Sequence, residues 1–384
     1  MKRLLLLGGG HAQLFVLEAF ARAPLAGVEL VLVTPTRLAP YSGMMPGVIA
    51  GHYRYEDACV DLVPLCGAAG CRLDLTRALR VDAAARRVHC ENGRVLDYDL
   101  LSLDTGSTPG TFGVPGVEAW ARPVKPIDRF VADLDAYCAR LAPDRPARVV
   151  VAGAGAAGCE VALALAYRID RLSQDGRAGP LQITVASNRP QILPGFPDGL
   201  RLRMERALSI RGIAAETQGP VAAVEAQRVV LADGTVLDSD FTVWATGSSA
   251  PDWPQQAGFT TDDQGFVEVD ACLRSVSHPE VFASGDLATL RDEPRPKSGV
   301  YAVRAGPPLA ANLRAVLEGR QPVPYLPQRR ALALISCGER YAVGMWGPLS
   351  WEGRWVWTWK DRIDRRFISR FSPAGIESGL ATAA

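Results

Sequence analysis

The 384-residue chain lacks an excess of charge of either sign. Its 42 Lys and Arg residues stand against 41 Asp and Glu residues, which leaves a formal net charge of +1. A general nucleic-acid binder relies on an excess of Lys and Arg to neutralise phosphates. The near-balance of charge therefore argues against that class of protein.

Cysteine and histidine are too few and too scattered for a disulfide framework or a metal centre. Eight cysteines in a chain of this length do not resemble the dense pairing of secreted domains, so a reducing, cytoplasmic compartment is expected. With four histidines and no close Cys/His pairing, no metal site is expected. The apolar run at residues 4–7 is too short for a signal peptide, and residues 149–167 carry glycines typical of a strand, a turn and a helix rather than of a membrane span.

Apolar residues, by contrast, make up 48% of the chain. At about 150 residues per domain, the length allows two or three domains, each with enough apolar residues for its own core. The composition therefore predicts a folded protein with more than one domain.

Glycine occurs where a nucleotide-binding turn needs it. Residues 2–7 form an apolar run of strand length, Gly8-Gly9-Gly10 follow, and a helical pattern covers residues 12–22. Such a unit brings backbone N–H groups and the positive end of a helix to a pyrophosphate. Two features depart from the usual motif: Gln13 holds the third glycine position, and no acidic ribose ligand follows the second strand, predicted at residues 28–33.

The same pattern recurs in the second half of the chain. A valine-rich run over residues 148–152 leads into a complete motif of Gly153, Gly155 and Gly158, with an apolar helix over residues 159–167 and a strand over residues 181–186. Two such units in one chain are far more specific than one. They predict an α/β fold with two Rossmann-like domains.

Further strands end in polar turns. Residues 98–103 lead into Asp104-Thr105-Gly106-Ser107, and residues 241–244 lead into Ala245-Thr246-Gly247-Ser248. A third strand, over residues 280–283, leads into Ser284-Gly285-Asp286, which places a carboxylate at the sheet edge where ligands bind. The alternative role for Asp286 is an N-cap of the segment that follows.

Together these motifs resemble the two-dinucleotide-binding-domain flavoproteins of the pyridine nucleotide-disulfide oxidoreductase superfamily, over residues 1–320. The segments GGGHAQ (8–13), PYSGMMPG (40–47) and WVWTWKD (355–361) are similar to one subgroup, the NADH dehydrogenase-like flavoproteins found alone or as an N-terminal extension of selenophosphate synthetase. More distantly, the chain is similar to type II NADH:quinone dehydrogenases and sulfide:quinone reductases. The resemblance implies a glutathione-reductase-like fold and an enzyme that uses FAD and NAD(P)H.

The resemblance implies an FAD site in the first half. Asp286 would face the ribityl or pyrophosphate oxygens, and Lys297, also a candidate catalytic residue, would line the pyrimidine end of the flavin. The predicted FAD contacts are Gly8, Gly10, His11, Ala12, Thr34, Arg37, Ser42, Gly43, Met44, Thr105, Gly106, Gly285, Asp286, Lys297 and Ser298.

It also implies that NAD(P)H binds in the second half as a co-substrate. The predicted contacts are Gly153, Gly155, Ala156, Gly158, Glu160, Ser187, Arg189, Ala245, Thr246 and Gly247. Glu160 matches a carboxylate near the nicotinamide in quinone-reducing relatives, which makes it the second catalytic candidate; its alternative role is a first-turn acid that complements the helix dipole. No acid follows the strand at residues 181–186, and Arg189 could meet a 2′-phosphate, so the choice between NADH and NADPH stays open.

The predicted function is hydride transfer from NAD(P)H to the flavin, followed by electron transfer to a quinone or another small acceptor. Ancestry favours a quinone. The residues weaken that expectation, because residues 301–306 hold no glutamine where quinone-reducing relatives carry a glutamine-rich motif.

Thiol chemistry is the alternative. A sulfide- or selenide-oxidising flavoprotein would use Cys159, near a helix N-terminus, together with Cys337. Cys66 and Cys71 suit structural roles better, because Cys71 begins a predicted strand over residues 71–75. A third possibility is a redox partner subunit of selenophosphate synthesis.

The C-terminal segment concentrates tryptophan and positive charge. Five of the eight tryptophans fall between residues 346 and 359, and residues 354–370 hold six basic against two acidic residues. An apolar residue recurs at every fourth position, as in an interfacial or partner-binding helix. These residues are Trp355, Trp359, Ile363, Phe367 and Phe371.

Residues 351–371 therefore predict a peripheral membrane contact, a homodimer contact or a contact with selenophosphate synthetase. The alternative is a strand over residues 355–359 followed by an ordinary surface helix. The predicted organisation is a discontinuous FAD domain (1–118 and 266–320), an NAD(P) domain with its linker (119–265) and a C-terminal interface or membrane-surface module (321–384). The protein is expected in the cytoplasm, either free or on the cytoplasmic face of the membrane.

Overall fold

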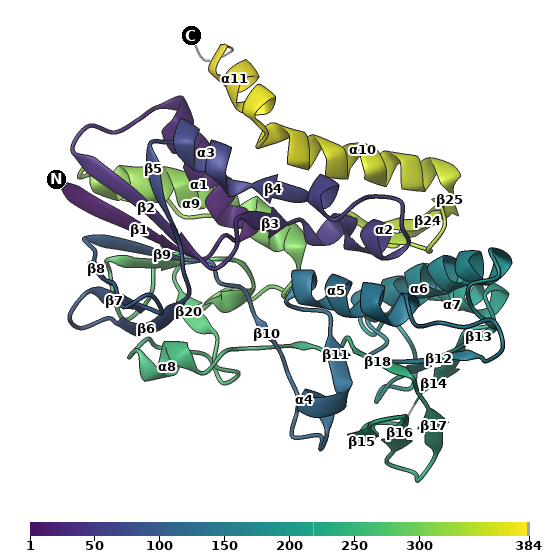
Figure 1. Cartoon of the computed structure of the whole chain (residues 1–384). Coiled ribbons are helices and arrows are strands. Elements are labelled where there is room, and N and C mark those ends of the chain that lie inside the picture. Colours follow the sequence, from purple (N-terminus) through teal and green to yellow (C-terminus); the bar gives the residue numbers. More distant parts are fainter. Residues whose placement is uncertain (218, 382–384) are drawn as a thin grey trace.

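The first glycine turn lies at the carboxyl end of the central strand of a five-stranded parallel sheet (Figure 1). The structure, a computed structural model, describes residues 1–217 and 219–381. Leu4, Leu5 and Leu6 are fully buried, as expected of a parallel strand covered on both faces. In spatial order, the strands are β21 (Val281–Ala283), β9 (Leu100–Leu103), β1 (Lys2–Leu7), β2 (Val28–Thr34) and β5 (Cys71–Leu75).

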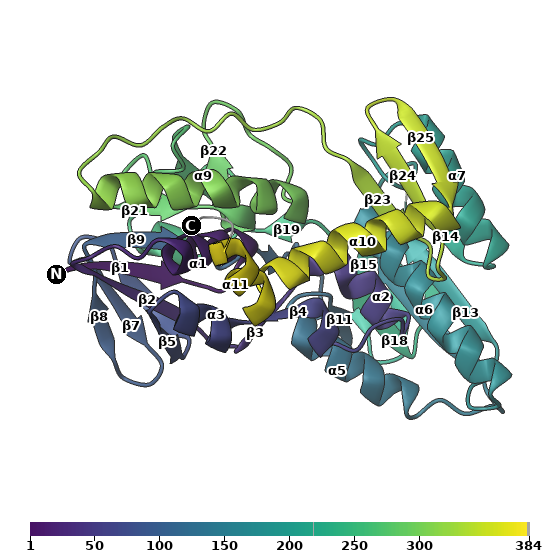
Figure 2. The ribbon, with the colours of Figure 1, turned by 90° about the horizontal axis from the view of Figure 1, so that it is seen from above.

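Two long helices, α1 (His11–Arg22) and α9 (Gly299–Leu317), pack side by side on this sheet (Figure 2). A Cβ at Gly306 of α9 would collide with the ring of Phe15 on α1, so glycine lets the two helices approach closely. The chain returns from the second half to complete this unit with β21 and α9.

The second sheet repeats the plan and is also parallel. Its glycine turn lies between β12 (Ala147–Ala152) and α6 (Ala156–Gln174). Helix α6 packs against the sheet together with α5 (Ile127–Cys138) and α7 (Asp198–Ile210). The predicted strands over residues 181–186 and 241–244 are confirmed. In spatial order, the strands are β11 (Ala121–Pro123), β18 (Phe241–Trp244), β12 (Ala147–Ala152), β13 (Leu181–Ala186) and β14 (Ala214–Glu216).

Two short strands mark where the chain passes between the sheets. β10 (Thr108–Pro109) leads toward the second sheet, β19 (Ser248–Ser249) leads back, and the two pair antiparallel. Smaller elements surround the two sheets. They are β3 (Leu38–Pro40), α2 (Met45–Ile49), β4 (Cys59–Asp61), α3 (Leu62–Ala68), β6 (Ala78–Asp82), β7 (Arg87–Cys90), β8 (Val95–Asp97), α4 (Val117–Trp120), β15 (Val221–Glu225), β16 (Arg228–Leu231), β17 (Val236–Asp238), α8 (Trp253–Gln256), β20 (Val267–Val269) and β22 (Ala288–Leu290).

The C-terminal segment forms a hairpin sheet and then a long helix that crosses from the second unit to the first (Figure 2). The sheet consists of β23 (Ala333–Ser336), β24 (Ala342–Trp346) and β25 (Leu349–Gly353). Helices α10 (Arg354–Arg370) and α11 (Pro373–Ala381) follow, and α11 packs against α1. Residues 382–384 of the predicted C-terminal module lie outside the described residues.

The alternative of a strand over residues 355–359 is wrong, because helix α10 begins at Arg354. The four-residue spacing of the aromatic residues places their rings on one helical face. That face divides along its length: Trp355, Trp359 and Ile363 are 57%, 37% and 39% exposed, whereas Phe367 and Phe371 are buried against α1. Within residues 1–217 and 219–381, no helix combines the length and the apolar character that crossing a membrane requires.

Candidate active site

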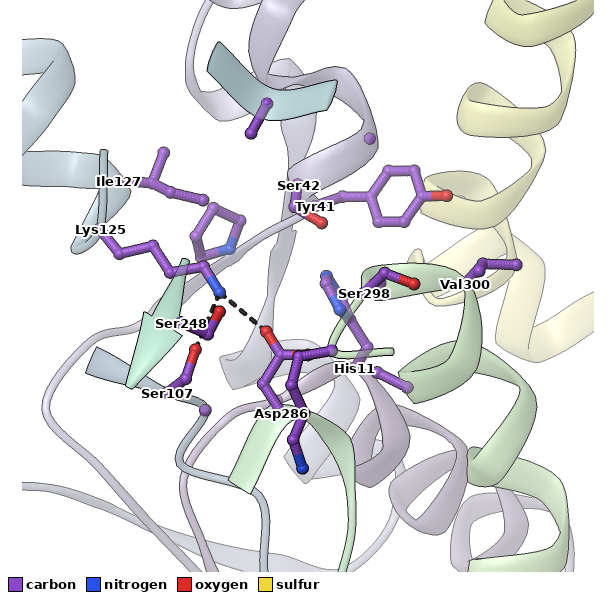
Figure 3. A pocket seen from close by; sticks show the side chains of 18 of the residues that line it. His11, Tyr41, Ser42, Ser107, Lys125, Ile127, Ser248, Asp286, Ser298 and Val300 are labelled. Atoms are coloured by element: carbon purple, nitrogen blue, oxygen red, sulfur yellow. Dashed lines mark hydrogen bonds and ion pairs between the residues drawn. The ribbon is translucent and has the colours of Figure 1, made fainter. Parts of the chain in front are cut away.

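Both glycine turns open into one cavity of about 3620 Å³. A pocket for a single small ligand usually measures roughly 300–1,000 Å³, so this cavity has room for two dinucleotides. Figure 3 shows part of its wall, with residues from both units pointing toward one another.

Most of the predicted nucleotide contacts line this cavity, although they come from both halves of the chain. On the first unit they are Gly8, Gly10, His11, Thr34, Ser42, Gly43, Thr105, Gly106, Asp286, Lys297 and Ser298. On the second they are Gly153, Gly155, Ala156, Glu160, Ser187, Arg189, Ala245, Thr246 and Gly247.

Five predicted contacts lie outside the cavity lining. The guanidinium of Arg37 is held by Asp61 at 2.6 Å, and Met44 is buried in a small apolar cluster. The other three have contacts inside the turns. The backbone N–H of Ala12 donates to Asp104, and a Cβ at Gly158 or Gly285 would collide with neighbouring atoms.

A buried carboxylate, Asp104, holds the first turn together. It accepts a hydrogen bond from the backbone N–H of Ala12 at 2.9 Å, and a Cβ at either Gly10 or Gly285 would collide with it. Burial raises the pKa of Asp104 to about 7, and the negative charge of Asp286 acts in the same direction. Asp104 was not among the predicted site residues; its only sequence signal is its place directly after a buried strand.

Gln13 explains how the first turn works without its third glycine. Its side chain is fully buried, and Nε2 donates to the carbonyl oxygens of Leu7 at 3.2 Å and Ser102 at 2.8 Å. The amide thus links α1 to β1 and β9. The Gln13 side chain therefore stabilises the packing of the turn from inside the protein and does not extend to the side where a ligand would bind.

The second turn has the shape of a pyrophosphate cradle. Gly153 has a φ of +115°, and a Cβ there or at Gly158 would collide with backbone carbonyls, so both glycines are needed for the turn and for helix packing. A Cβ at Gly155 would meet nothing within 4 Å. The N-terminus of α6 therefore faces open space, as dinucleotide binding requires.

A salt bridge joins the two units across the cavity. Nζ of Lys125 donates to Asp286 at 2.8 Å and to the hydroxyl of Ser107 at 3.4 Å (Figure 3). Asp286 does not cap the turn that follows it, because Ser284 is the N-cap residue there and no side chain makes the capping hydrogen bond. Lys125 belongs to the segment that was predicted as a linker, where no local pattern indicated a role.

Histidine 11 is neutral at ordinary pH. Burial lowers its pKa to about 4, although the charge of Asp286 opposes that shift. The ring packs edge-on against Tyr41 and Phe367, with centroids 5.4 Å and 5.9 Å away. His11 is therefore an uncharged part of the wall at the start of α1.

Helix α10 contributes a buried ion pair to the wall. Nζ of Lys360 donates to the carbonyl oxygen of Gly43 and, at 2.6 Å, to Asp364. Lys360 also lowers the pKa of Glu160, whereas burial raises it more strongly, to about 7. Oε1 of Glu160 accepts from the backbone N–H of Ser336 at 2.8 Å. The helix predicted as a surface module thus closes the cavity with its inner face.

The side chain of Lys297 is already engaged by its own domain. Nζ donates to the carbonyl oxygen of Ala288 at 2.5 Å and to Thr289 at 2.7 Å, and it lies 3.9 Å from the centroid of the Phe266 ring. Burial lowers its pKa to about 8. These bonds favour a positioning role for Lys297 over a catalytic one.

The candidate thiols are buried in the core. Cys159 and Cys337 are 0% and 4% exposed, and neither lines the cavity. Burial raises the pKa of each thiol to about 12, which opposes formation of the reactive thiolate. Cys66 and Cys71 are likewise buried, and Cys71 begins β5 as predicted.

Two pyrophosphate cradles on two parallel sheets, facing one cavity, define a two-dinucleotide oxidoreductase. The chain belongs to the pyridine nucleotide-disulphide oxidoreductase family, whose model matches residues 2–306. The protein is therefore an oxidoreductase that uses FAD and NAD(P)H, and the predicted α/β fold with two Rossmann-like units is confirmed.

Several relatives resemble the chain over most of its length. It is 30% identical to an NADH dehydrogenase-like protein of Mycobacterium tuberculosis, over 76% of this chain and 74% of that protein. It is 24% identical to the type II NADH:quinone oxidoreductase of Staphylococcus epidermidis, over 98% and 97% of the two chains.

Solved structures share the fold. The sulfide:quinone oxidoreductase of Aquifex aeolicus matches with a TM-score of 0.81 at 19% identity, over 98% of this chain and 92% of that one. NDH2 of Plasmodium falciparum, solved with NADH, matches with a TM-score of 0.80 at 15% identity, over 96% and 98%.

Proposed function

We propose that the protein transfers hydride from NAD(P)H to bound FAD and passes the electrons to a quinone. The observation that carries this proposal is the single cavity that both glycine cradles share. The bound flavin would supply the two-electron chemistry. The chain's own contribution is to orient two dinucleotides, to exclude water between them and to supply protons.

The best-placed proton carrier is Glu160. A carboxyl group with a pKa near 7 gains and loses a proton readily at ordinary pH. Glu160 lies beside the second cradle, just past the first turn of α6, so it is not the first-turn acid offered as its alternative role. The charge of Lys360 lowers its pKa, and Lys360 also donates to the carbonyl oxygen of Gly43 on the first unit. Glu160 is therefore placed to hold a proton that accompanies reduction of the acceptor.

Exposed apolar residues in the cavity lining support a quinone as the acceptor. Trp346 and Ile363 line the cavity and are 48% and 39% exposed. Nearby, the rings of Trp351, Trp355 and Trp359 lie in near-parallel pairs, with centroids 6.3–6.5 Å apart. A quinone is carried in the lipid phase, so we propose that this tryptophan face rests on the membrane surface. The names of the quinone-reducing relatives agree with this acceptor.

Anaerobic stopped-flow spectroscopy tests the proposal. NADH or NADPH should bleach the flavin absorbance, and a short-chain quinone added next should restore it. Bleaching by neither nucleotide, or reduced flavin that no quinone reoxidises, would contradict the proposal.

Variants Cys159→Ser and Cys337→Ser serve as controls for thiol chemistry. Because both thiols are buried away from the cavity, each variant should be reduced at the wild-type rate. Sulfide-driven bleaching that these substitutions abolish would favour the sulfide- or selenide-oxidising alternative instead.

Homodimerisation and a partnership with selenophosphate synthetase stay predictions.

A further inference from the structure

The end of strand β13 lies beside the second cradle. Ala186, its last residue, pairs in register with Ala152, and its carbonyl accepts the N–H of Gly153 at 2.8 Å. The turn at residues 187–189 therefore begins next to the glycine motif. In open parallel sheets, the adenosine ribose of a dinucleotide binds at this edge.

The turn offers hydrogen-bond donors and no acid. Ser187, Asn188 and Arg189 all line the cavity. An acidic side chain at this place would bind the ribose 2′-hydroxyl of NADH, whereas an arginine accommodates the 2′-phosphate of NADPH. A hydroxyl, an amide and a guanidinium together suit a phosphate, which only accepts hydrogen bonds.

The local geometry leaves the cation available. The backbone N–H of Arg189 donates to Oγ of Ser187 at 3.1 Å, which fixes the turn. Within the described part of the chain, the guanidinium of Arg189 has neither a hydrogen bond nor an ion pair of its own. It thus differs from Arg148 and Arg201 of the same unit, each of which is paired with carboxylates.

The adjacent strand ends near this turn with a glutamate that does not line the cavity. Strand β14 ends on Glu216, whose backbone carbonyl accepts the N–H of Ser187 at 2.9 Å. The side chain of Glu216 is exposed and is not part of the cavity lining. Arg189 is therefore the charged side chain that this edge presents to the cavity.

We propose that residues 187–189 form a 2′-phosphate site and that the protein prefers NADPH to NADH. This inference rests on the proposed function and names its electron donor. It separates this chain from relatives whose names specify NADH.

Titration calorimetry of the holoprotein with the non-reacting nucleotides NADP⁺ and NAD⁺ tests the site. NADP⁺ should bind more tightly, and 2′,5′-ADP should bind more tightly than 5′-AMP. In Arg189→Gln, the affinity for NADP⁺ should fall roughly ten- to a hundredfold, since a hydrogen bond to a charged group is lost, while the affinity for NAD⁺ stays within about twofold.

Two further variants sharpen the test. Ser187→Glu should reverse the preference, because its carboxylate repels the 2′-phosphate and accepts from a 2′-hydroxyl. Arg177→Gln, at an exposed arginine outside the cavity lining, is the matched control and should bind both nucleotides like the wild type.

The outcomes separate this inference from the proposed function. Equal or tighter wild-type binding of NAD⁺ overturns the inference, as does an equal loss for both nucleotides in Arg189→Gln. Flavin bleaching by NADH with no preference for NADPH overturns the inference alone. Bleaching by neither nucleotide overturns the proposed function as well.

Discussion

The two glycine cradles share one plan but differ in how they are closed. In the first, the carboxylate of Asp104 fills the space beside Gly10, and Lys360 of the C-terminal helix donates to Gly43. In the second, the space beside Gly155 is open, and Arg189 is unpaired among the residues described. The first cradle is closed by contacts within the protein, whereas the second leaves open space for a ligand.

This difference suits the predicted placement of resident FAD on the first cradle and of NAD(P)H, a co-substrate, on the second. A resident cofactor gains affinity from a rigid, preformed site, because less conformational freedom is lost on binding. A co-substrate must leave after each turnover, so an open turn with few internal bonds suits it. We therefore expect the two copies of the motif to differ in how tightly they hold their ligands.

Alanine in each cradle should produce the largest contrast. In Gly10→Ala, the new methyl group collides with Asp104, so flavin content should fall more than tenfold and the free energy of unfolding by about 1–3 kcal/mol. Gly155→Ala, with a φ of −72° that alanine also adopts, should keep its FAD. Flavin absorbance per protein and denaturant unfolding measure both effects. Equal flavin content in the two variants would argue against the comparison.

The lock on the first cradle should depend on Lys360. In Lys360→Met, Asp364 stays buried without its partner, which should cost about 3–5 kcal/mol of unfolding free energy. The control, Arg365→Met, removes an exposed ion pair with Asp361 and should cost under about 1 kcal/mol. Denaturant unfolding compares the two, and similar costs would show that α10 does not lock the site.

Each cradle has a carboxyl group with a raised pKa: Asp104, which is buried, and Glu160, which is partly buried at the cavity wall. Burial raises the pKa of Glu160 and of Asp104 to about 7, above the value of roughly 4 expected in the unfolded chain. The folded state therefore binds more protons between these values, and stability should decline as the pH rises from about 4.5 through 7.

In Glu160→Gln, this decline should shrink by at most about 3 kcal/mol, and Asp104→Asn should reduce it separately. Unfolding free energies measured from pH 5 to pH 8 test the prediction. An unchanged pH profile in both variants would show that these groups keep ordinary pKa values.

The smallest effect on either cradle should come from the outer end of α10. Trp355→Gln and Trp359→Gln should change stability by about 1 kcal/mol or less and leave flavin content unchanged, because these rings are exposed. Flotation with anionic phospholipid vesicles should weaken. The control, Leu202→Gln, alters an exposed leucine on α7 and should float like the wild type. Normal flotation of both tryptophan variants would contradict the membrane contact.

Local sequence patterns accounted for much of the fold and for the ligand class. A continuous apolar run followed by glycine depends only on neighbouring residues, so the strands at residues 2–7, 181–186 and 241–244 were predicted with the bounds they have. The two glycine turns followed from the same patterns, whereas the use of FAD and NAD(P)H was implied by the resemblance to a family of flavoproteins. The helix at residues 354–370 was harder, because aromatic residues favour both strands and interfacial helices.

Local sequence patterns could not predict contacts between residues that lie far apart in the sequence. Lys125 meets Asp286, and Lys360 meets Gly43, only because the folded chain brings two units and a terminal helix together. The burial of Cys159 and Cys337 is likewise a property of the packed core. The sequence by itself determined that two dinucleotides bind, since glycine turns are local. Only the tertiary structure decided which cradle is closed and which groups carry shifted pKa values, because burial and charge pairing arise from long-range contacts.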